Sequence, residues 1–116
     1  MLLRLGLIGC FGLFSAFAQS TCEGTAAFSP CEFTFELSAS EAAAHLNLYQ
    51  EIELHIEFRS PRFHTYMMPA FWAGGRKLIV RFTPTEPGAW IYKITSNLPS
   101  LEGKAGNFNA AESDLP

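Results

Sequence analysis

Alternating apolar and polar residues mark several short segments of the chain as half-buried strands. These runs occupy residues 31–37, 51–58, 76–82 and 90–94, with a less regular one over 63–70 and a last short one around 107–109. A period of two places successive side chains on opposite faces of a sheet. Residues 40–45 favour helix but are too few to form a stable one, so we expect a single helical turn there. Six or seven short strands without an amphipathic helix predict an antiparallel, immunoglobulin-like β-sandwich of about seven strands.

The segment Glu86-Pro87-Gly88-Ala89-Trp90-Ile91-Tyr92 has the layout of a corner between two strands of such a sandwich. Pro87 fixes its own φ angle, and Gly88 can then adopt a positive φ, as a type II turn requires. A sugar-stacking role for Trp90 would require an exposed ring, which its place in an alternating strand disfavours. The pattern therefore predicts four aromatic core residues: Phe71, Phe82, Trp90 and Tyr92.

The N-terminal residues have the features of a secretory signal peptide. Arg4 precedes an apolar run that ends in the small residues around Ala16 and Ala18, so we expect cleavage after Ala18. An uncleaved anchor is the alternative, but the run is shorter than a membrane span. The expected organisation is a signal peptide over 1–18, the sandwich over 19–110 and a linker-like tail over 111–116. The mature protein would be secreted or periplasmic and would not contact a membrane.

Charge and cysteine content narrow the possible functions. After cleavage, eleven acidic residues face seven basic ones, which gives a formal charge of −4 without a basic cluster, so nucleic acid is not an expected partner. Cys10 leaves with the signal peptide, and Cys22 and Cys31 remain in an oxidising compartment. A disulfide between them would staple the N-terminal strand. Two free thiols are the alternative, and a metal-binding pair is disfavoured because no other ligand lies at a suitable spacing.

Candidate catalytic and metal-binding residues lie along one predicted strand. Glu51, Glu53 and Glu57 alternate on one face, whereas glycoside hydrolysis needs two carboxylates facing each other across a cleft. His55 could share a metal with His64 if the strand register placed them opposite each other, although such polar stripes are usually solvated surface. No nucleophile elbow or phosphate-binding glycine loop is present in the sequence. We therefore expect no catalytic residue, metal or cofactor.

The segment 66–72, Tyr-Met-Met-Pro-Ala-Phe-Trp, is too apolar to be fully exposed and too irregular to be fully buried. Three interpretations are open. Phe71 could point inward and leave Tyr66, Met67 and Trp72 as a contact surface for another protein domain, because methionine and aromatic residues suit such contacts. Tyr66 and Trp72 could instead form a flat stacking platform for a sugar. Most of the segment could also fill the core, since a small sandwich needs nearly all its aromatic residues.

Five short motifs, in order, resemble the domain of unknown function 5060 family. They are Asn47-Leu48-Tyr49, Phe71-Trp72-Ala73-Gly74-Gly75, Val80-Arg81-Phe82-Thr83-Pro84, Gly88-Ala89-Trp90-Ile91-Tyr92 and Gly103-Lys104-Ala105-Gly106-Asn107-Phe108. The resemblance implies an immunoglobulin-like sandwich at the N-terminus of a secreted bacterial protein, commonly followed by an apiosidase-like or other glycoside-hydrolase (β/α)8 barrel. Leu48, Ala73 and Ala89 depart from the usual proline, aspartate and glutamate of the family, which weakens the case for a polar ligand function.

The resemblance therefore implies a non-catalytic accessory domain that packs against or positions a catalytic barrel, and we expect that barrel to be missing from this chain. Its partner would be the barrel or another protein domain. A carbohydrate-binding module that holds polysaccharide through exposed aromatic residues is the alternative.

Overall fold

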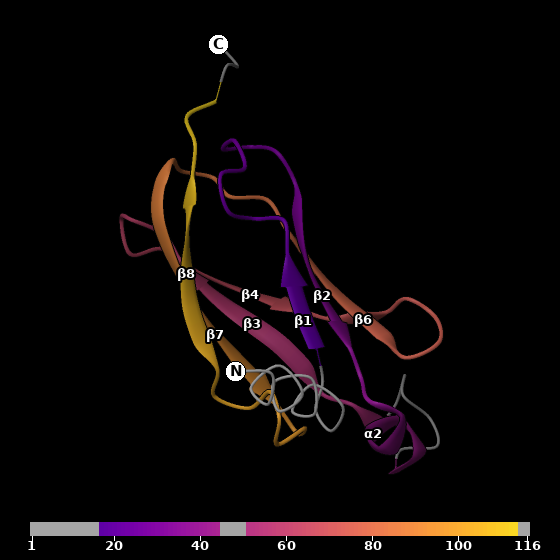
Figure 1. Cartoon of the computed structure of the whole chain (residues 1–116). Helices are drawn as coiled ribbons and strands as arrows, with labels where there is room; N and C mark the ends of the chain where they lie inside the picture. Colours follow the sequence, from indigo (N-terminus) through magenta and orange to yellow (C-terminus); the bar gives the residue numbers. More distant parts are fainter. Residues whose placement is uncertain (1–16, 45–50, 114–116) are drawn as a thin grey trace, which may run out of the picture.

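The computed structural model describes residues 17–44 and 51–113, and its strands form two antiparallel sheets packed face to face (Figure 1). One sheet has the order β1-β2-β6-β5 and the other the order β4-β3-β7-β8. The strands of the first sheet are β1 (Phe17–Ser20), β2 (Cys31–Glu36), β6 (Lys77–Phe82) and β5 (Phe71–Trp72). Those of the second are β4 (Thr65–Pro69), β3 (Leu54–Arg59), β7 (Gly88–Ser96) and β8 (Ala105–Ala110). A short helix, α2 (Ala39–Ala44), follows β2.

The predicted sandwich is confirmed, with eight strands in the described residues where the sequence indicated about seven. Two strands have no counterpart among the predicted runs: β5, and β1, which pairs with β2 from Phe17 to Ser20 and so extends across the predicted cleavage site after Ala18. The irregular run 63–70 contributes β4, and a separate two-residue strand, β5, follows it. The predicted helical turn at 40–45 is α2 up to Ala44. Its start is capped reciprocally, because the Ser38 hydroxyl accepts from the Glu41 N–H and the Glu41 carboxylate accepts from the Ser38 N–H.

The core is an aromatic layer between the two sheets. Alternate residues of β2, β3, β6, β7 and β8 point inward, as the sequence pattern predicts. Phe58 and Phe82 stack across the interface with ring centroids 4.0 Å apart. Trp90 is fully buried and lies parallel to Phe108, with centroids 6.2 Å apart. Burying a large aromatic side chain removes 150–250 Å² from water, which contributes about 4–6 kcal/mol as an upper estimate.

Of the four aromatic core residues predicted, Phe82 and Trp90 are buried, Tyr92 is partly buried against the core, and Phe71 is not in the core. The prediction for Phe71 was wrong because of the pairing of β5. Phe71 lies opposite Ile79, which faces outward between the buried residues Leu78 and Val80. Phe71 therefore shares the outer face of the sheet, and 43% of its surface is exposed.

The corner between β6 and β7 matches the sequence prediction. Gly88 has a φ of 118°, in the region that favours glycine, and an added Cβ atom would lie 3.0 Å from Cγ of Pro61. Two residues later, the Trp90 indole Nε1–H donates to the Glu86 carbonyl oxygen at 2.9 Å. The corner therefore satisfies the one polar atom of the largest buried side chain.

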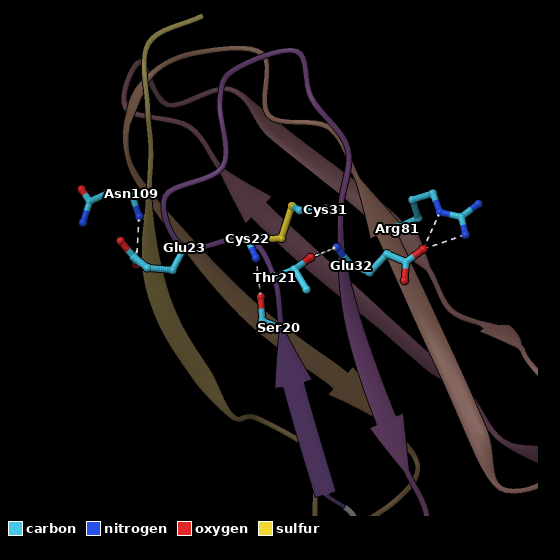
Figure 2. The surroundings of a disulfide bond; sticks show 8 residues. All are labelled: Ser20, Thr21, Cys22, Glu23, Cys31, Glu32, Arg81 and Asn109. Carbon is cyan, nitrogen blue, oxygen red and sulfur yellow. Dashed lines mark hydrogen bonds and ion pairs between the residues drawn. A yellow bond between two sulfur atoms is a disulfide. The ribbon is translucent and has the colours of Figure 1, made fainter.

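A disulfide joins Cys22 to Cys31, the pairing that the sequence left open, and both residues are buried (Figure 2). It closes the loop that connects β1 and β2. Beside it, the Thr21 hydroxyl accepts from the Glu32 N–H, and the Glu23 carboxylate accepts from the Asn109 N–H of β8. The bridge thus fixes a loop that contacts both sheets.

We expect replacement of both Cys22 and Cys31 by serine to lower the free energy of unfolding by roughly 2–3 kcal/mol, since the bridge restricts a short loop in the unfolded chain. Urea denaturation of the variant and of the unaltered protein measures the difference. Addition of reductant to the unaltered protein should lower its stability similarly, and should leave the variant unchanged. An equal effect of reductant on both proteins would contradict this assignment.

Replacement of Gly88 by alanine should destabilise the protein by about 1–3 kcal/mol, because the new side chain is strained at a positive φ and meets Pro61. Gly103→Ala is the matched control. Gly103 also has a positive φ, of 80°, but an added Cβ would have no heavy atom within 4 Å. Thermal unfolding should show the larger loss of stability for Gly88→Ala. Equal losses in the two variants would show that contact with Pro61 does not contribute.

Candidate functional site

The three residues predicted as a contact surface come from two strands, β4 and β5, which are separated in the chain by Ala70. Met67 and Trp72 are exposed, at 56% and 47% of their surface, but Met67 belongs to β4 and Trp72 to β5, which lie in different sheets. Met67 pairs with Glu57 and faces outward from its sheet. Trp72 pairs with the inward-facing Leu78 at the sheet edge, and its Nε1–H donates to the Gly75 carbonyl oxygen at 3.0 Å.

Tyr66 instead closes the edge of the core. Its ring lies 6.0 Å from that of Phe82 and 5.9 Å from that of Trp90, measured between centroids. Its hydroxyl is 3.2 Å from the Thr85 hydroxyl, so the polar end of the side chain reaches the β6–β7 corner. Tyr66 therefore packs against the core, whereas Trp72 is exposed.

The guanidinium group of Arg81 lies over the ring of Phe71. The Arg81 guanidinium carbon is 5.4 Å from the Phe71 ring centroid, and Nε and Nη2 of Arg81 both donate to the same carboxylate oxygen of Glu32. Arg81 is thus held between an aromatic face and an acid on the outer surface of the first sheet. This arrangement covers part of the Phe71 ring and leaves Trp72 as the more accessible neighbour.

A shallow hollow of about 380 Å³ lies on the outer face of the other sheet, around Ile91. It is lined by Glu57, Arg59, Ile91, Tyr92, Lys93, Ala105 and Gly106. Glu57 is the single carboxylate of this lining, whereas the mechanisms that cleave glycosides use two acids across a cleft. Of the three predicted acidic residues, Glu57 alone lies within β3, since Glu51 and Glu53 precede it. The geometry of the hollow therefore gives no support to hydrolysis.

The register of β3 and β4 separates the two histidines that could have shared a metal. His55 pairs with Pro69, whereas His64 precedes β4 and its carbonyl oxygen accepts from the Ser60 N–H. The two histidines therefore lie at opposite ends of the ladder. Within residues 17–44 and 51–113, no group of three or more histidine, cysteine, aspartate or glutamate residues is placed to hold a metal ion.

The β6–β7 corner carries the most developed polar network of these candidate sites. The Glu86 carboxylate accepts from the Arg62 N–H at 3.2 Å and lies 3.0 Å from Nδ1 of His64. A hydrogen bond from Ser60, followed by those from His64 and Arg62, lowers the pKa of Glu86 below its ordinary value of 4.5 and outweighs the effect of partial burial. The side chain is 13% exposed. Glu86 thus ties the β3–β4 loop to the β6–β7 corner.

Two exposed aromatic residues lie outside every surface that the sequence indicated. Phe28, in the loop between β1 and β2, and Phe63, in the loop between β3 and β4, are 56% and 78% exposed. Both have positive φ values, 69° and 67°. Each is a bulky residue within a segment rich in turn-forming residues, which is only a weak sequence signal of an exposed ring.

Comparison with known proteins assigns the chain to a family. The profile of the domain of unknown function 5060 matches residues 25–97, which is more than half of the chain. The chain belongs to the domain of unknown function 5060 family. The predicted family membership is therefore confirmed, and the match spans the segment from the disulfide loop to the end of β7. The last of the five motifs, 103–108, lies beyond the matched residues, and the first, 47–49, lies outside the residues that the structure describes.

Two solved structures share the fold. One is described as a putative glycoside hydrolase from Bacteroides vulgatus, with a TM-score of 0.65 and 19% sequence identity over 78% of this chain. The match covers 16% of that protein, so this chain spans only a small part of its length. The other is the Lin-41 filamin domain, with a TM-score of 0.59 and 10% identity over 83% of this chain and 93% of that domain. No match was found among curated protein sequences.

Two further observations bear on where the protein works. The Cys22–Cys31 disulfide is consistent with a compartment outside the reducing cytosol. In the part of the chain that the structure describes, no helix has the length and apolar character needed to cross a bilayer.

Replacement of Glu86 by glutamine should destabilise the protein at neutral pH and have little effect in acid. A carboxyl group whose pKa is lowered by folding contributes stability above its unfolded pKa, and loses that contribution as the pH falls through the folded pKa. Urea denaturation at pH 7 and at several values below 4.5 should show the two stability curves converging toward low pH. Glu57→Gln, in the open hollow, is the control, and a gap that stays constant with pH for Glu86→Gln would contradict the assignment.

Proposed function

We propose that this sandwich is a non-catalytic accessory domain of a secreted glycoside-hydrolase-like protein, in which it packs against or positions a catalytic (β/α)8 barrel. The observation that carries the proposal is the match of most of this chain to 16% of the Bacteroides vulgatus protein. The sandwich corresponds to a small portion of a much larger polypeptide whose description names a glycoside hydrolase. Membership of the same domain family as the motifs implied adds independent support.

The chemistry of the surface is in keeping with a scaffold. The hollows on the sheet face and at the corner are open, and the corner hollow is lined by Pro61, Arg62, Thr85, Glu86 and Pro87. An acid catalyst of glycoside hydrolysis needs a site that excludes water to raise its pKa, but the Glu86 pKa is lowered. The Glu86 carboxylate therefore accepts hydrogen bonds within the fold and lacks the raised pKa of an acid catalyst.

In this proposal the chain is secreted, with signal peptide cleavage after Ala18. Exposed Met67 and Trp72 are one candidate contact surface for the partner domain, because soft and aromatic side chains suit protein interfaces. Tyr66 supports this edge from the inside through its contacts with Phe82 and Trp90. Residues 111–116 act as the connection to the rest of the polypeptide.

The alternative is a carbohydrate-binding module, and one observation favours it. Trp72 and Phe71 are adjacent exposed aromatic residues on β5, and aromatic rings suit stacking on the apolar faces of sugars. Trp72 would then be the stacking residue. Phe71 would contribute less, since Arg81 lies over its ring.

Titration of the protein with plant and bacterial polysaccharides, followed by tryptophan fluorescence, separates the two functions. Trp72 is the exposed reporter, whereas Trp90 is buried and would respond little. We expect no saturable change. A saturable change that disappears in Trp72→Phe would establish the carbohydrate-binding alternative. Hydrolysis of aryl glycosides by the unaltered chain, lost in Glu57→Gln, would contradict both and indicate an enzyme.

A further inference from the structure

One end of the sandwich displays two bulky apolar side chains in strained backbone positions. Phe28 and Phe63 both have φ values near 70°, which non-glycine residues of this size rarely adopt, and both are more than half exposed. Exposure of an aromatic ring forgoes the burial that stabilises a fold, and a positive φ adds backbone strain. Nothing in the stability of the isolated sandwich accounts for this combination.

Hydrogen bonds fix both loops in these positions. The Phe28 N–H donates to the Pro84 carbonyl oxygen at 2.7 Å, and the Ser29 N–H donates to the Ala26 carbonyl oxygen at 3.0 Å. In the other loop, the Phe63 N–H donates to the Ser60 carbonyl oxygen at 2.9 Å, and the His64 N–H donates to the Ser60 hydroxyl at 3.0 Å. The rings are therefore presented on defined turns.

The two loops flank the same β6–β7 corner. The loop of Phe28 is bonded to its start at Pro84. The loop of Phe63 meets its end, where Pro61 lies against Gly88 and Glu86 accepts from Arg62. We call Phe28, Phe63 and the exposed prolines Pro30 and Pro87 the loop-end surface. Its members are apolar and rigid, features that reduce the entropy cost of an interface.

The end of the described chain runs beside the β1–β2 loop (Figure 1). The Ala111 N–H donates to the Thr25 carbonyl oxygen at 2.7 Å, and the Ala111 carbonyl oxygen accepts from the Ala27 N–H at 2.8 Å. Ala111 is thus held next to the residue that precedes Phe28. A domain connected through residues 111–116 would begin its path within reach of the loop-end surface.

We propose that the loop-end surface is the docking site for the glycoside-hydrolase domain of the same polypeptide, with the rings of Phe28 and Phe63 as anchors. This inference rests on the proposed accessory function and names the surface through which it acts. The main contact then lies at the end of the sandwich where Ala111 follows β8. Met67 and Trp72, the other candidate contact surface, lie outside this interface. The strain and exposure at Phe28 and Phe63 are then offset by burial against the partner.

The first test uses the intact chain alone. Asparagine tolerates positive φ values, so Phe28→Asn and Phe63→Asn should relieve strain without removing a buried group. The melting temperature of the double variant should be unchanged or a few degrees higher. A decrease like that of the core variant Phe82→Ala would show that the two rings serve the fold itself, and would overturn the proposal.

The second test asks whether the surface binds another copy of the chain, and it uses the same double variant. Sedimentation equilibrium should show a monomer for both the unaltered chain and the double variant. A concentration-dependent dimer that disappears in the double variant would assign the surface to a second copy of the chain, and would overturn the proposed occupant.

The third test uses the intact Bacteroides vulgatus protein, in which the matching part and the rest of the chain are already joined. The two positions that superpose on Phe28 and Phe63 are replaced by aspartate, and those that superpose on Met67 and Trp72 are replaced in a matched control. Scanning calorimetry should show the matching part unfolding separately from the rest in the first variant only.

The remaining outcomes distinguish the two proposals. Separate unfolding in the control but not in the first variant would overturn the loop-end surface and leave the accessory function standing. Separate unfolding in the unaltered protein would mean that the two parts do not pack together, which would overturn the accessory function as well.

Discussion

Burial of Trp90 between the two sheets is the interaction on which the rest of the structure depends. Its ring contacts Phe82 of one sheet and Phe108 of the other, with centroids 5.1 Å and 6.2 Å away, and none of its surface is exposed. The burial of one such residue is comparable with much of the net stability of a small domain, typically about 5–15 kcal/mol. The sheets of a sandwich this small are held together by a few aromatic residues, so the position of each is tightly constrained.

The polar corner follows from that burial. A buried indole needs an acceptor for its N–H group, and the Glu86 carbonyl oxygen supplies it. The carboxylate of the same residue accepts hydrogen bonds from the Ser60, Arg62 and His64 loop. Glu86 therefore couples the core to the β3–β4 loop, and thereby to Phe63. Hydrogen bonds through Glu86 thus connect the β3–β4 part of the loop-end surface to the buried Trp90.

The division between inner and outer faces also bears on the proposed accessory role. The inner faces of both sheets are occupied by core side chains, and the hollow around Ile91 lies on an outer face. The outer faces carry charged residues and shallow hollows, which suit solvation. The exposed large apolar side chains lie on edge strands and loops, except for Ile91 on the outer face of β7.

The sequence by itself determined the fold class, the corner and most of the core. Period-two alternation can be recognised without knowledge of neighbouring strands, because a strand places successive side chains on opposite faces, and Trp90 was predicted on that basis. Gly88 was predicted from the turn chemistry of Pro87-Gly88. The family was also predictable, because its motifs lie within short segments. The two cysteines indicated a bridge, but their pairing required the fold to bring them together.

Only the tertiary structure decided the positions of Phe71, Tyr66, Phe28 and Phe63. In a two-residue strand such as β5, the sequence pattern is too short to predict which face each side chain occupies. Its pairing with β6 places Phe71 beside the outward-facing Ile79, and Trp72 beside the inward-facing Leu78 at the edge of the sheet. The same holds for His55 and His64, whose separation depends on strand register. The loops of Phe28 and Phe63 are held by hydrogen bonds to residues distant in sequence, such as those to Pro84 and Glu86. Such long-range bonds cannot be predicted from the local sequence.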